Sequence, residues 1–531
     1  MNLITDKWIP VLRQYGPDKI APWQIVEPEN RVVEINAPRP DFQGALYQFL
    51  IGLLQTAFAP EDEEAWQEYW EEVPDPENLK KALADEKIKK AFELYNPDGP
   101  AFMQDFDFPE GQEKTISGLF IEAPGEKTLK DNWDHFVKRG QVNSLCESCA
   151  ATALLTLQIN APEGGRGYRV GLRGGGPLTT LIVPKNADTY LWHKVWLNIL
   201  NNEDNEQLTK PNILAADVLP WLGPTRISDN NGVATTPSDV HALQMYWSMP
   251  CRIRLKGNEE KGICDICGKA SDFMYKTFRT SNYGIHYIGP WVHPLTPYRF
   301  DANHQSPPIS LKGQRGGLGY RHWLGLALQD VNTGERSATV VQFYNYERGP
   351  SFFNSQATVL WCFGYDLKKN KARCWYDTRF PLFLLDDNQR ENLVFWAGEL
   401  IGTAREAVKI LRSAVKSAWF KRPGDVKGDM SNIDRQFWET TEPKFFELLD
   451  NMAKLPGDTR MAPPEIYLTW FKTLEKAMFE LFEKATLYNN PEDYNLKRII
   501  RAKQYLSKAF YTNKAIKGIK VKTNQEVVAD E

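Results

Sequence analysis

The sequence lacks the short motifs that most often mark an active site. None of its 7 histidines stands in an H-x-x-x-H, H-D or H-x-E pattern, and no G-x-S-x-G nucleophile elbow occurs. A G-x-x-x-x-G-K-[ST] phosphate loop and a G-x-G-x-x-G match are also absent. Acidic residues are plentiful, but they do not gather into a nuclease-like cluster. We therefore expect a protein that is not an enzyme.

The chain also lacks an excess of positive charge, an export signal and a run that could cross a membrane. Its net charge is -4, so any contact with nucleic acid must come from local patches. Residues 1–8 do not show a signal-peptide pattern. The apolar run 46–58 is too short to span a bilayer and contains Gln48 and Gln55, so we predict a buried helix there. With 531 residues and 42% apolar residues, we expect a cytoplasmic globular protein of at least two domains, without a membrane partner.

Cysteine is scarce, and its placement is informative. Four of the 7 cysteines form two C-x-x-C pairs, Cys146/Cys149 and Cys264/Cys267, with 114 residues between them. Each pair can hold a metal ion from one side, and two pairs complete a tetrahedral site of four sulfurs. The sequence therefore predicts a structural zinc ion with no open position for catalysis. Four reduced thiols in loops are the alternative, and disulfides are disfavoured in a reducing compartment.

The most unusual segment lies between the two cysteine pairs. Residues 162–177, which we call the glycine segment, contain seven glycines and three arginines. Glycine lets backbone N–H groups come close to a ligand, and arginine adds charge and planar donors. This composition suits a backbone that lies in a nucleic-acid groove. An ordinary hairpin loop is the alternative.

Two further segments carry charge at predicted loop tips. Lys138 and Arg139 can contact phosphate, and the nearby Phe136 can stack on a base. Strands at 359–365 and 372–376 flank a tip, 366–371, that contains three lysines. We call residues 359–376 the lysine hairpin and residues 366–371 its lysine tip. The tip is a candidate for contact with a DNA backbone. In both cases a solvated surface loop is the alternative.

The character of the sequence changes near residue 380. Helical periodicity follows at 388–422, 431–454, 463–488 and 491–512, with Pro, Gly and Asn at the connections. We predict an α+β protein with a mixed α/β domain at 1–380, in which 340–345 is a strand, and a four-helix bundle at 381–531. A charged stripe on the first helix and nine Lys or Arg within 497–522 are candidate phosphate contacts. The stripe consists of Arg405, Lys409, Arg412 and Lys416.

Several motifs together resemble the CasA family, the large subunits of the type I-E CRISPR surveillance complex Cascade. The order and spacing of the motifs carry the resemblance over nearly the whole chain, most weakly in the helical third. The motifs are Asn2-Leu3-Ile4 with Trp8-Ile9-Pro10-Val11, Pro100-Ala101-Phe102-Met103-Gln104, Leu145-Cys146-x-x-Cys149, Ala161-Pro162 with Gly171-Leu172-Arg173-Gly174-Gly175 and Pro177, Trp291-x-His293-Pro294, and Val341-x-Phe343.

The resemblance implies a function. Members of the family sit at the 5′ end of the crRNA and read the protospacer-adjacent motif of double-stranded target DNA, mainly from the minor groove. They help to open the duplex and support recruitment of the helicase–nuclease. The implied partners are the other Cascade subunits, crRNA, target DNA and the helicase–nuclease, and the implied cofactor is zinc held by the four cysteines.

The resemblance also implies roles for residues. The loop that anchors the subunit near the crRNA end matches the region of Phe136, Lys138 and Arg139. The family's lysine finger falls near Asn282, within residues 280–283, with Arg279 nearby, and a lysine is missing there. The glycine loop that contacts the motif matches Glu163, Gly164, Gly165 and Arg166, and the glutamine wedge falls on Lys368, Lys369, Asn370 and Lys371, where no glutamine occurs.

Two other functions remain open from the sequence. One is a zinc-stabilised enzyme that acts on nucleic acid through a dispersed acidic site. The other is a scaffold whose charged patches bind protein. Metal-dependent cleavage by the purified chain would favour the enzyme. Indifference of DNA affinity to substitutions in the glycine segment or at the lysine tip would favour the scaffold.

Overall fold

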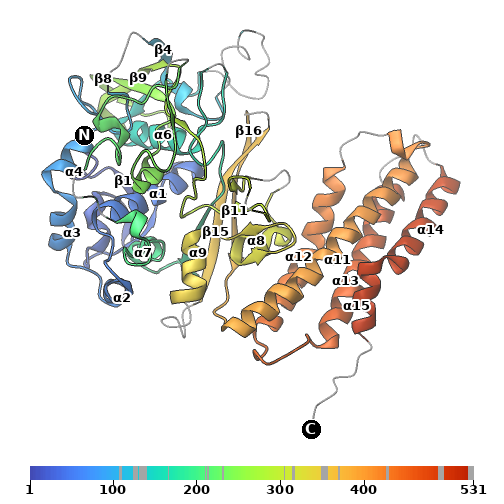
Figure 1. Ribbon diagram of the computed structural model, residues 1–531. Coiled ribbons are helices and arrows are strands. Elements are labelled where there is room, and N and C mark those ends of the chain that lie inside the picture. Colours follow the sequence, from blue (N-terminus) through green and yellow to red (C-terminus); the bar gives the residue numbers. More distant parts are fainter. Residues whose placement is uncertain are drawn as a thin grey trace. The chain divides into compact units, whose positions relative to one another are not determined.

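The computed structural model divides the chain into two compact units (Figure 1). It describes residues 1–106, 111–123, 130, 140–165, 167–209, 211, 214–229, 232–303, 305–313, 317–348, 357–368, 371–425, 430–487 and 495–523. The first unit comprises Met1–Gly313, Ala338–Tyr344 and Ser355–Leu382, and the second comprises Gln314–Ser337, Asn345–Asn354 and Phe383–Glu531. The chain passes between units for the last time at Leu382–Phe383. We keep the division into domains 1–380 and 381–531 as a proposal.

Helix α1 (Pro40–Ala57) forms the core of the first unit. Pro40 occupies its first turn, where the missing N–H costs nothing, and almost every later residue is buried. The two glutamines inside the apolar run are satisfied: Gln48 accepts from Arg173, and Gln55 bonds the backbone of Leu200 in both directions. The prediction of a buried helix is confirmed.

Within its described residues, the first unit contains three antiparallel sheets of three or four strands. One has the order β2-β1-β3, from Gly16–Ile20, Ile9–Arg13 and Val32–Ile35. A second joins β4 (Gln112–Thr115), β9 (Ala270–Ser281) and β5 (Leu145–Cys146), and the long β8 (Arg252–Ile263) also pairs with β9. The third has the order β16-β15-β6, from Lys371–Pro381, Thr358–Lys368 and Thr179–Pro184.

The predicted strand at 340–345 is wrong. Helix α9 (Thr339–Phe343) begins there. The buried positions are Val340, Val341, Tyr344 and Asn345, a spacing of one, three and one that belongs to a helix. A short apolar run cannot distinguish a strand from a buried helical turn by periodicity alone.

The second unit contains the predicted helical bundle. Its helices are α11 (Asp387–Trp419), α12 (Ser431–Ala453), α13 (Pro464–Leu487), α14 (Leu496–Thr512) and the short α15 (Lys514–Lys522), which was not predicted. The Trp470 indole donates to the carbonyl of Leu400 across α13 and α11 at 3.0 Å. The α+β fold with a C-terminal helix bundle is confirmed.

The second unit also takes in a segment from the middle of the chain. Tyr320 stacks on Phe445 with ring centroids 4.4 Å apart, and its hydroxyl lies 2.9 Å from that of Thr441. Helix α8 (Trp323–Ala327) follows directly. Within the described ranges, no helix combines the length and the apolar character needed to cross a membrane.

Candidate metal centre and nucleic-acid interface

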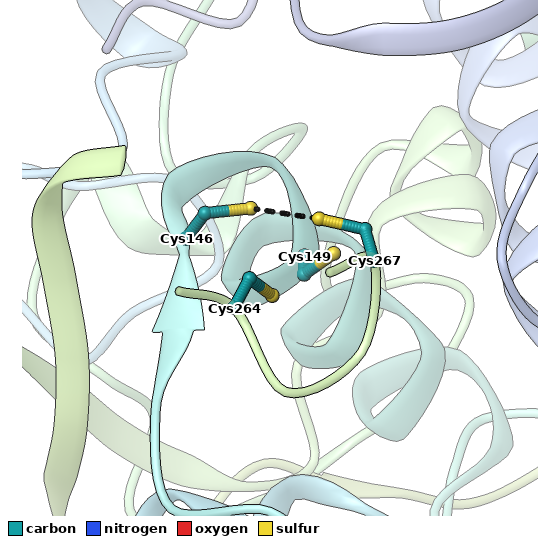
Figure 2. Close-up of side chains that lie close together, drawn as sticks. All are labelled: Cys146, Cys149, Cys264 and Cys267. Atoms are coloured by element: carbon teal, nitrogen blue, oxygen red, sulfur yellow. Dashed lines mark hydrogen bonds between the residues drawn. The ribbon is translucent and has the colours of Figure 1, made fainter. Parts of the chain in front are cut away.

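The four predicted metal ligands come together in the first unit. Cys146 ends β5, and Cys149 lies in the first turn of helix α6 (Glu147–Asn160). Cys264 and Cys267 lie in the turn between β8 and β9. Pairing of Cys146 with Met274 of β9 brings the two C-x-x-C segments side by side. Figure 2 shows the four side chains directed toward one another.

The sulfur positions fit a single tetrahedral ion. The four Sγ atoms all lie within 4.8 Å of one another, and those of Cys146 and Cys267 are 3.8 Å apart. A tetrahedral zinc ion with bonds of about 2.3 Å would place its sulfurs about 3.8 Å apart. A disulfide would need two sulfur atoms about 2.05 Å apart, and all seven cysteines are free thiols. The donor set suits zinc or another thiophilic ion.

Backbone contacts hold the second cysteine turn in place. The N–H of Gly268 donates to the carbonyl of Cys264 at 2.9 Å, and Gly268 has a φ of +69°, which favours glycine. Asp265 accepts from the N–H groups of Asn143 and Ser144 at 2.7 and 2.8 Å, which fastens this turn to the chain before β5. Hydrogen bonds with neighbouring thiols, together with burial, raise the pKa of the Cys149 thiol. A bound cation would offset this by stabilising the thiolate.

The glycine segment lies against the segment that contains Asn282. Gly164 and Gly165 are exposed. Gly167 has a φ of +83°, and its carbonyl accepts from the N–H of Tyr283 at 2.7 Å. A Cβ atom at Gly167 would lie 2.7 Å from Cβ of the exposed Asn282. The position of the predicted finger and the glycine segment therefore form one surface.

The other end of the glycine segment lies against β15. Gly176 has a φ of +58°, and an added Cβ would lie 2.9 Å from Cγ of Leu367 and 3.0 Å from the carbonyl oxygen of Tyr365. Gly175 packs against Pro162 and Leu367. Lys368 follows directly at the exposed end of β15 and pairs with Lys371 of β16. The glycine segment thus connects the Asn282 segment with the lysine hairpin.

Comparison with known proteins identifies the family of this chain. The family model of CRISPR-associated protein Cse1 matches residues 2–481. The chain belongs to the CRISPR-associated Cse1 family. The resemblance to CasA drawn from the sequence is confirmed, since CasA and Cse1 name the same protein in a solved relative.

Solved structures share the fold of this Cse1 chain. CasA (Cse1) from Thermus thermophilus has a TM-score of 0.68 and 18% identity, covering 96% of this chain and 99% of that chain. Thermobifida fusca Cse1 has a TM-score of 0.68 and 16% identity, covering 99% of both chains. A chain of a CRISPR RNA-guided surveillance complex has a TM-score of 0.67 and 15% identity, covering 96% of this chain and 99% of that chain.

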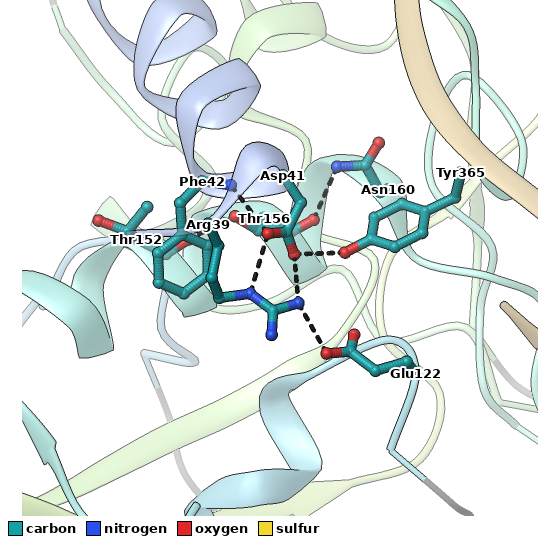
Figure 3. Close-up of polar contacts among 8 residues, drawn as sticks. All are labelled: Arg39, Asp41, Phe42, Glu122, Thr152, Thr156, Asn160 and Tyr365. Atoms are coloured by element: carbon teal, nitrogen blue, oxygen red, sulfur yellow. Dashed lines mark hydrogen bonds and ion pairs between the residues drawn. The ribbon is translucent and has the colours of Figure 1, made fainter. Parts of the chain in front are cut away.

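A buried polar network in the Cse1 chain links α1 to β15 (Figure 3). Arg39 donates two hydrogen bonds of 2.9 Å to Asp41 and one of 2.6 Å to Glu122. The hydroxyl of Tyr365 donates to the same Asp41 carboxylate, which is 3% exposed. Close packing adds to this link, because a Cβ at Gly44 of α1 would lie 2.6 Å from the ring of Phe363 on β15. The strand that carries the lysine hairpin is therefore fixed to the core helix.

The predicted stripe on α11 is largely engaged within the second unit. Arg405 donates to Asp330 at 3.1 Å, and Lys409 donates to Glu406 at 2.7 Å. Arg412 forms an ion pair of 3.3 Å with Asp434, and Lys416 is half-buried. The spacing of these four basic residues along one face of α11 therefore also suits hydrogen bonds and ion pairs within the second unit. These positions are the weakest part of the predicted interface.

Some predicted residues lie outside the part of the chain that the structure describes. They belong to the anchoring loop, the glycine segment and the lysine tip: Phe136, Lys138, Arg139, Arg166, Lys369 and Asn370. Of the remaining candidates, Arg279 is exposed on β9, where it pairs with Glu113 of β4 and Arg254 of β8. Glu163 is exposed beside Gly164.

Sequence reasoning did not single out Lys114, which lies beside the glycine segment, or Arg169, which lies within it. The ammonium of Lys114 on β4 donates to the hydroxyl of Tyr168 at 2.8 Å. The Arg169 guanidinium lies 5.8 Å from the ring centre of Tyr283 and donates to Ser228 at 2.7 Å. Arg169 thus places positive charge beside Tyr283, the neighbour of Asn282, and Lys114 places it beside Tyr168. Arg169 was visible in the segment composition, whereas nothing in the sequence around Lys114 indicates its position.

We expect Gly176→Ala to destabilise the first unit, whereas Gly165→Ala should not. The left-handed conformation costs about 1–2 kcal/mol for a residue with a Cβ. Overpacking against Leu367 and Tyr365 adds about 1 kcal/mol or more. No heavy atom of the described residues lies within 4 Å of a Cβ at Gly165, so the effect of Gly165→Ala should stay within about 0.5 kcal/mol. Urea denaturation measures the stability of both variants. Equal denaturation midpoints for Gly176→Ala and Gly165→Ala would contradict the packing described for Gly176.

Proposed function

We propose that this Cse1 chain is a non-catalytic subunit of an RNA-guided surveillance complex and recognises the protospacer-adjacent motif in double-stranded DNA. The observation that carries the proposal is the joining of three candidate DNA-contacting segments on one unit. The glycine segment lies against Asn282 at one end and against β15, which leads to Lys368, at the other. Structural similarity to a chain of a CRISPR RNA-guided surveillance complex supports membership of such an assembly.

The chemistry of this surface suits contact with a minor groove. Exposed glycines allow the backbone to approach closely, and Asn282 offers both a donor and an acceptor. The minor groove distinguishes A·T from G·C but little else, so such a reader should accept several related motifs. Lys368, Lys371, Arg279 and Arg169 would supply the phosphate contacts that position the duplex, and base pairing with the guide would supply the remaining specificity.

The proposal includes the other partners and the metal. The crRNA end would contact the segment of Phe136, Lys138 and Arg139, and the lysine hairpin would act as the wedge that helps to open the duplex. The family resemblance supports recruitment of a helicase–nuclease and a cytoplasmic location. Zinc held by the four cysteines would fasten β5 and α6 to the β8–β9 turn. With all four positions taken by thiolates, such an ion supports structure and not catalysis.

The test is target binding by the RNA-guided complex assembled with and without this chain. The probes are duplexes with the adjacent motif or a scrambled one, at fixed salt because phosphate contacts are salt-sensitive. We expect motif-dependent binding only when the chain is present. If affinity is the same with and without it, motif recognition is wrong.

We expect the double substitution Lys368→Ala/Lys371→Ala to weaken binding of the complex to both probes. Two phosphate contacts would be lost, so the slope of log affinity against log salt should fall by about 2. Lys454→Ala/Lys476→Ala is the matched control, because these exposed lysines lie on the bundle and pair with Asp450 and Glu480. An unchanged slope for the hairpin variant would remove the lysine hairpin from the interface.

A further inference from the structure

A groove with a volume of about 940 Å³ lies in the first unit, and none of the predicted DNA-contacting residues that the structure describes lines it. Its walls come from the β1–β2 hairpin, the start of β3, the end of helix α2 (Glu63–Glu71) and the residues around the start of helix α7 (Leu191–Trp196). We call it the hairpin groove. All of its lining residues belong to the same compact unit.

Two polar atoms in the lining are buried without a hydrogen-bond partner in the described part of the chain. They are the hydroxyl oxygen of Tyr190 and Nδ1 of His193. Nε2 of His193 lies 3.1 Å from the carbonyl oxygen of Trp70, which can only accept, so Nε2 carries the hydrogen. Nδ1 is therefore an unused acceptor. A buried acceptor without a partner is unfavourable, and a ligand with an N–H donor would satisfy it.

One flexible side chain covers part of this site. The guanidinium of Arg31 lies 4.0 Å from the ring centre of Tyr190, and Arg31 is exposed. It forms no ion pair with another described residue. A shift of the Arg31 side chain would uncover the tyrosine ring and leave the guanidinium free to donate to a carbonyl oxygen.

The remaining charges around the groove are mainly negative. Arg13 is neutralised by Asp18 and Glu27 at 2.7 and 2.6 Å. Glu71 and Asp188 line the groove, are exposed, and have no ion-pair partner among the described residues. Two further exposed carboxylates, Glu64 and Glu68, continue along the same face of α2 as Glu71, at helical spacings of four and three. This field repels phosphates and attracts cations.

Apolar contact area completes the groove. Leu12 and Tyr15 on the β1–β2 hairpin are 43% and 79% exposed. Val33 and Val73 add apolar lining. Once Arg31 has shifted, the groove would offer exposed apolar side chains, the unused acceptor of His193 and a guanidinium donor, which suits the alternating donors and acceptors of a polypeptide backbone.

We propose that the hairpin groove binds a basic polypeptide segment of another subunit of the complex. Backbone N–H groups of that segment would donate to His193, and its carbonyl groups would accept from Arg31 and from the hydroxyl of Tyr190. Lysine or arginine side chains would pair with Glu71 and Asp188. The inference rests on the proposed function, because it requires that the chain works within an assembly.

The test compares association of the full chain with the RNA–protein complex assembled from the other subunits. The variant is Glu71→Lys/Asp188→Lys, measured by biolayer interferometry. Losing two pairs and introducing repulsion should weaken association about tenfold. Glu391→Lys/Asp458→Lys is the control: both residues are exposed in the second unit, and the change in net charge is the same. Equal association of the groove variant and the wild-type chain would overturn the proposal.

Tyr190→Phe provides a second test that separates binding from folding. Its hydroxyl has no partner within the described chain, so the thermal stability of the isolated variant should be unchanged or slightly higher. Association with the same complex should nevertheless weaken about fivefold. A loss of stability with unchanged association would show a purely structural hydroxyl and would contradict the proposal.

Motif-dependent DNA binding distinguishes failure of this inference from failure of the proposed function. At saturating concentration, the groove variants should restore motif-dependent binding to the complex as fully as the wild-type chain. If the wild-type chain associates with the complex but confers no motif-dependent DNA binding, the proposed function is wrong and the proposal for the hairpin groove remains valid. If the groove variants instead lose binding of the isolated chain to duplex DNA, the occupant is nucleic acid and the polypeptide assignment is wrong.

Discussion

Replacing Cys264 with serine is expected to abolish binding of one zinc ion per chain and to lower the melting temperature by about 10 °C. The four sulfurs are held near the separation that a tetrahedral ion requires, so loss of one thiolate removes a quarter of the coordination shell. At free metal about a thousandfold above its dissociation constant, bound metal contributes about 4 kcal/mol to stability. In a domain of a few hundred residues, that corresponds to a shift of roughly this size.

The effect should be local before it is global. Among the described residues, Asp265 and a hydrogen bond from Ser144 to the carbonyl of Ile263 fasten the β8–β9 turn to the chain before β5, and the metal ligands would add to them. Without the ion, hydrogen exchange should increase first at residues 263–269 and at the start of α6. The pairing of β8 with β9 along its length would delay loss of the remaining sheet.

Cys374→Ser is the matched control for this prediction. Cys374 is exposed on β16, is a free thiol, and does not belong to the cysteine cluster. Metal content by plasma emission spectroscopy and melting by calorimetry give the two readouts. If Cys264→Ser and Cys374→Ser chains carry equal metal and melt together, the cluster is four reduced thiols and the metal assignment is wrong.

Features coded by neighbouring residues were predictable from the sequence. The cysteine spacing, the helix at 40–57 and the bundle helices follow from local patterns, and the structure confirms the fold. The prediction of a strand at 340–345 was wrong because six residues are too few to distinguish helical from strand periodicity.

Long-range pairing was the part that the sequence could not supply. Arg405 and Arg412 form a charged stripe by spacing, but their partners Asp330 and Asp434 come from other segments of the second unit. The contact between Gly176 and Leu367 joins positions 191 residues apart, and no local pattern indicates it. Glycine at this position is explained only when both segments are seen together.

Asp41→Ala is expected to lower the free energy of unfolding by about 2–3 kcal/mol, because hydrogen bonds to a buried, charged carboxylate are lost while Arg39 keeps Glu122 as a partner. Arg39 would lose two of its three carboxylate hydrogen bonds, and the buried hydroxyl of Tyr365 would lose its partner. Tyr365→Phe removes only one hydrogen bond from Asp41, so about 1–2 kcal/mol is expected. Urea denaturation of both single variants and the double variant measures the coupling. Because both substitutions disrupt the same bond, the double variant should be less destabilised than the sum of the two.

The same pair of variants tests whether the core network positions the lysine hairpin. Tyr365 lies two residues before Leu367, whose side chain contacts Gly175 and Gly176, and Lys368 follows directly. Release of Tyr365 from Asp41 should loosen this strand end where it meets the glycine segment. Motif discrimination by the assembled complex should then fall for Tyr365→Phe at a temperature where the variant is fully folded. Tyr467→Phe, which removes a hydroxyl bond to Glu399 within the bundle, is the control and should leave discrimination unchanged. Equal discrimination by both variants would limit the network to stability and separate it from motif recognition.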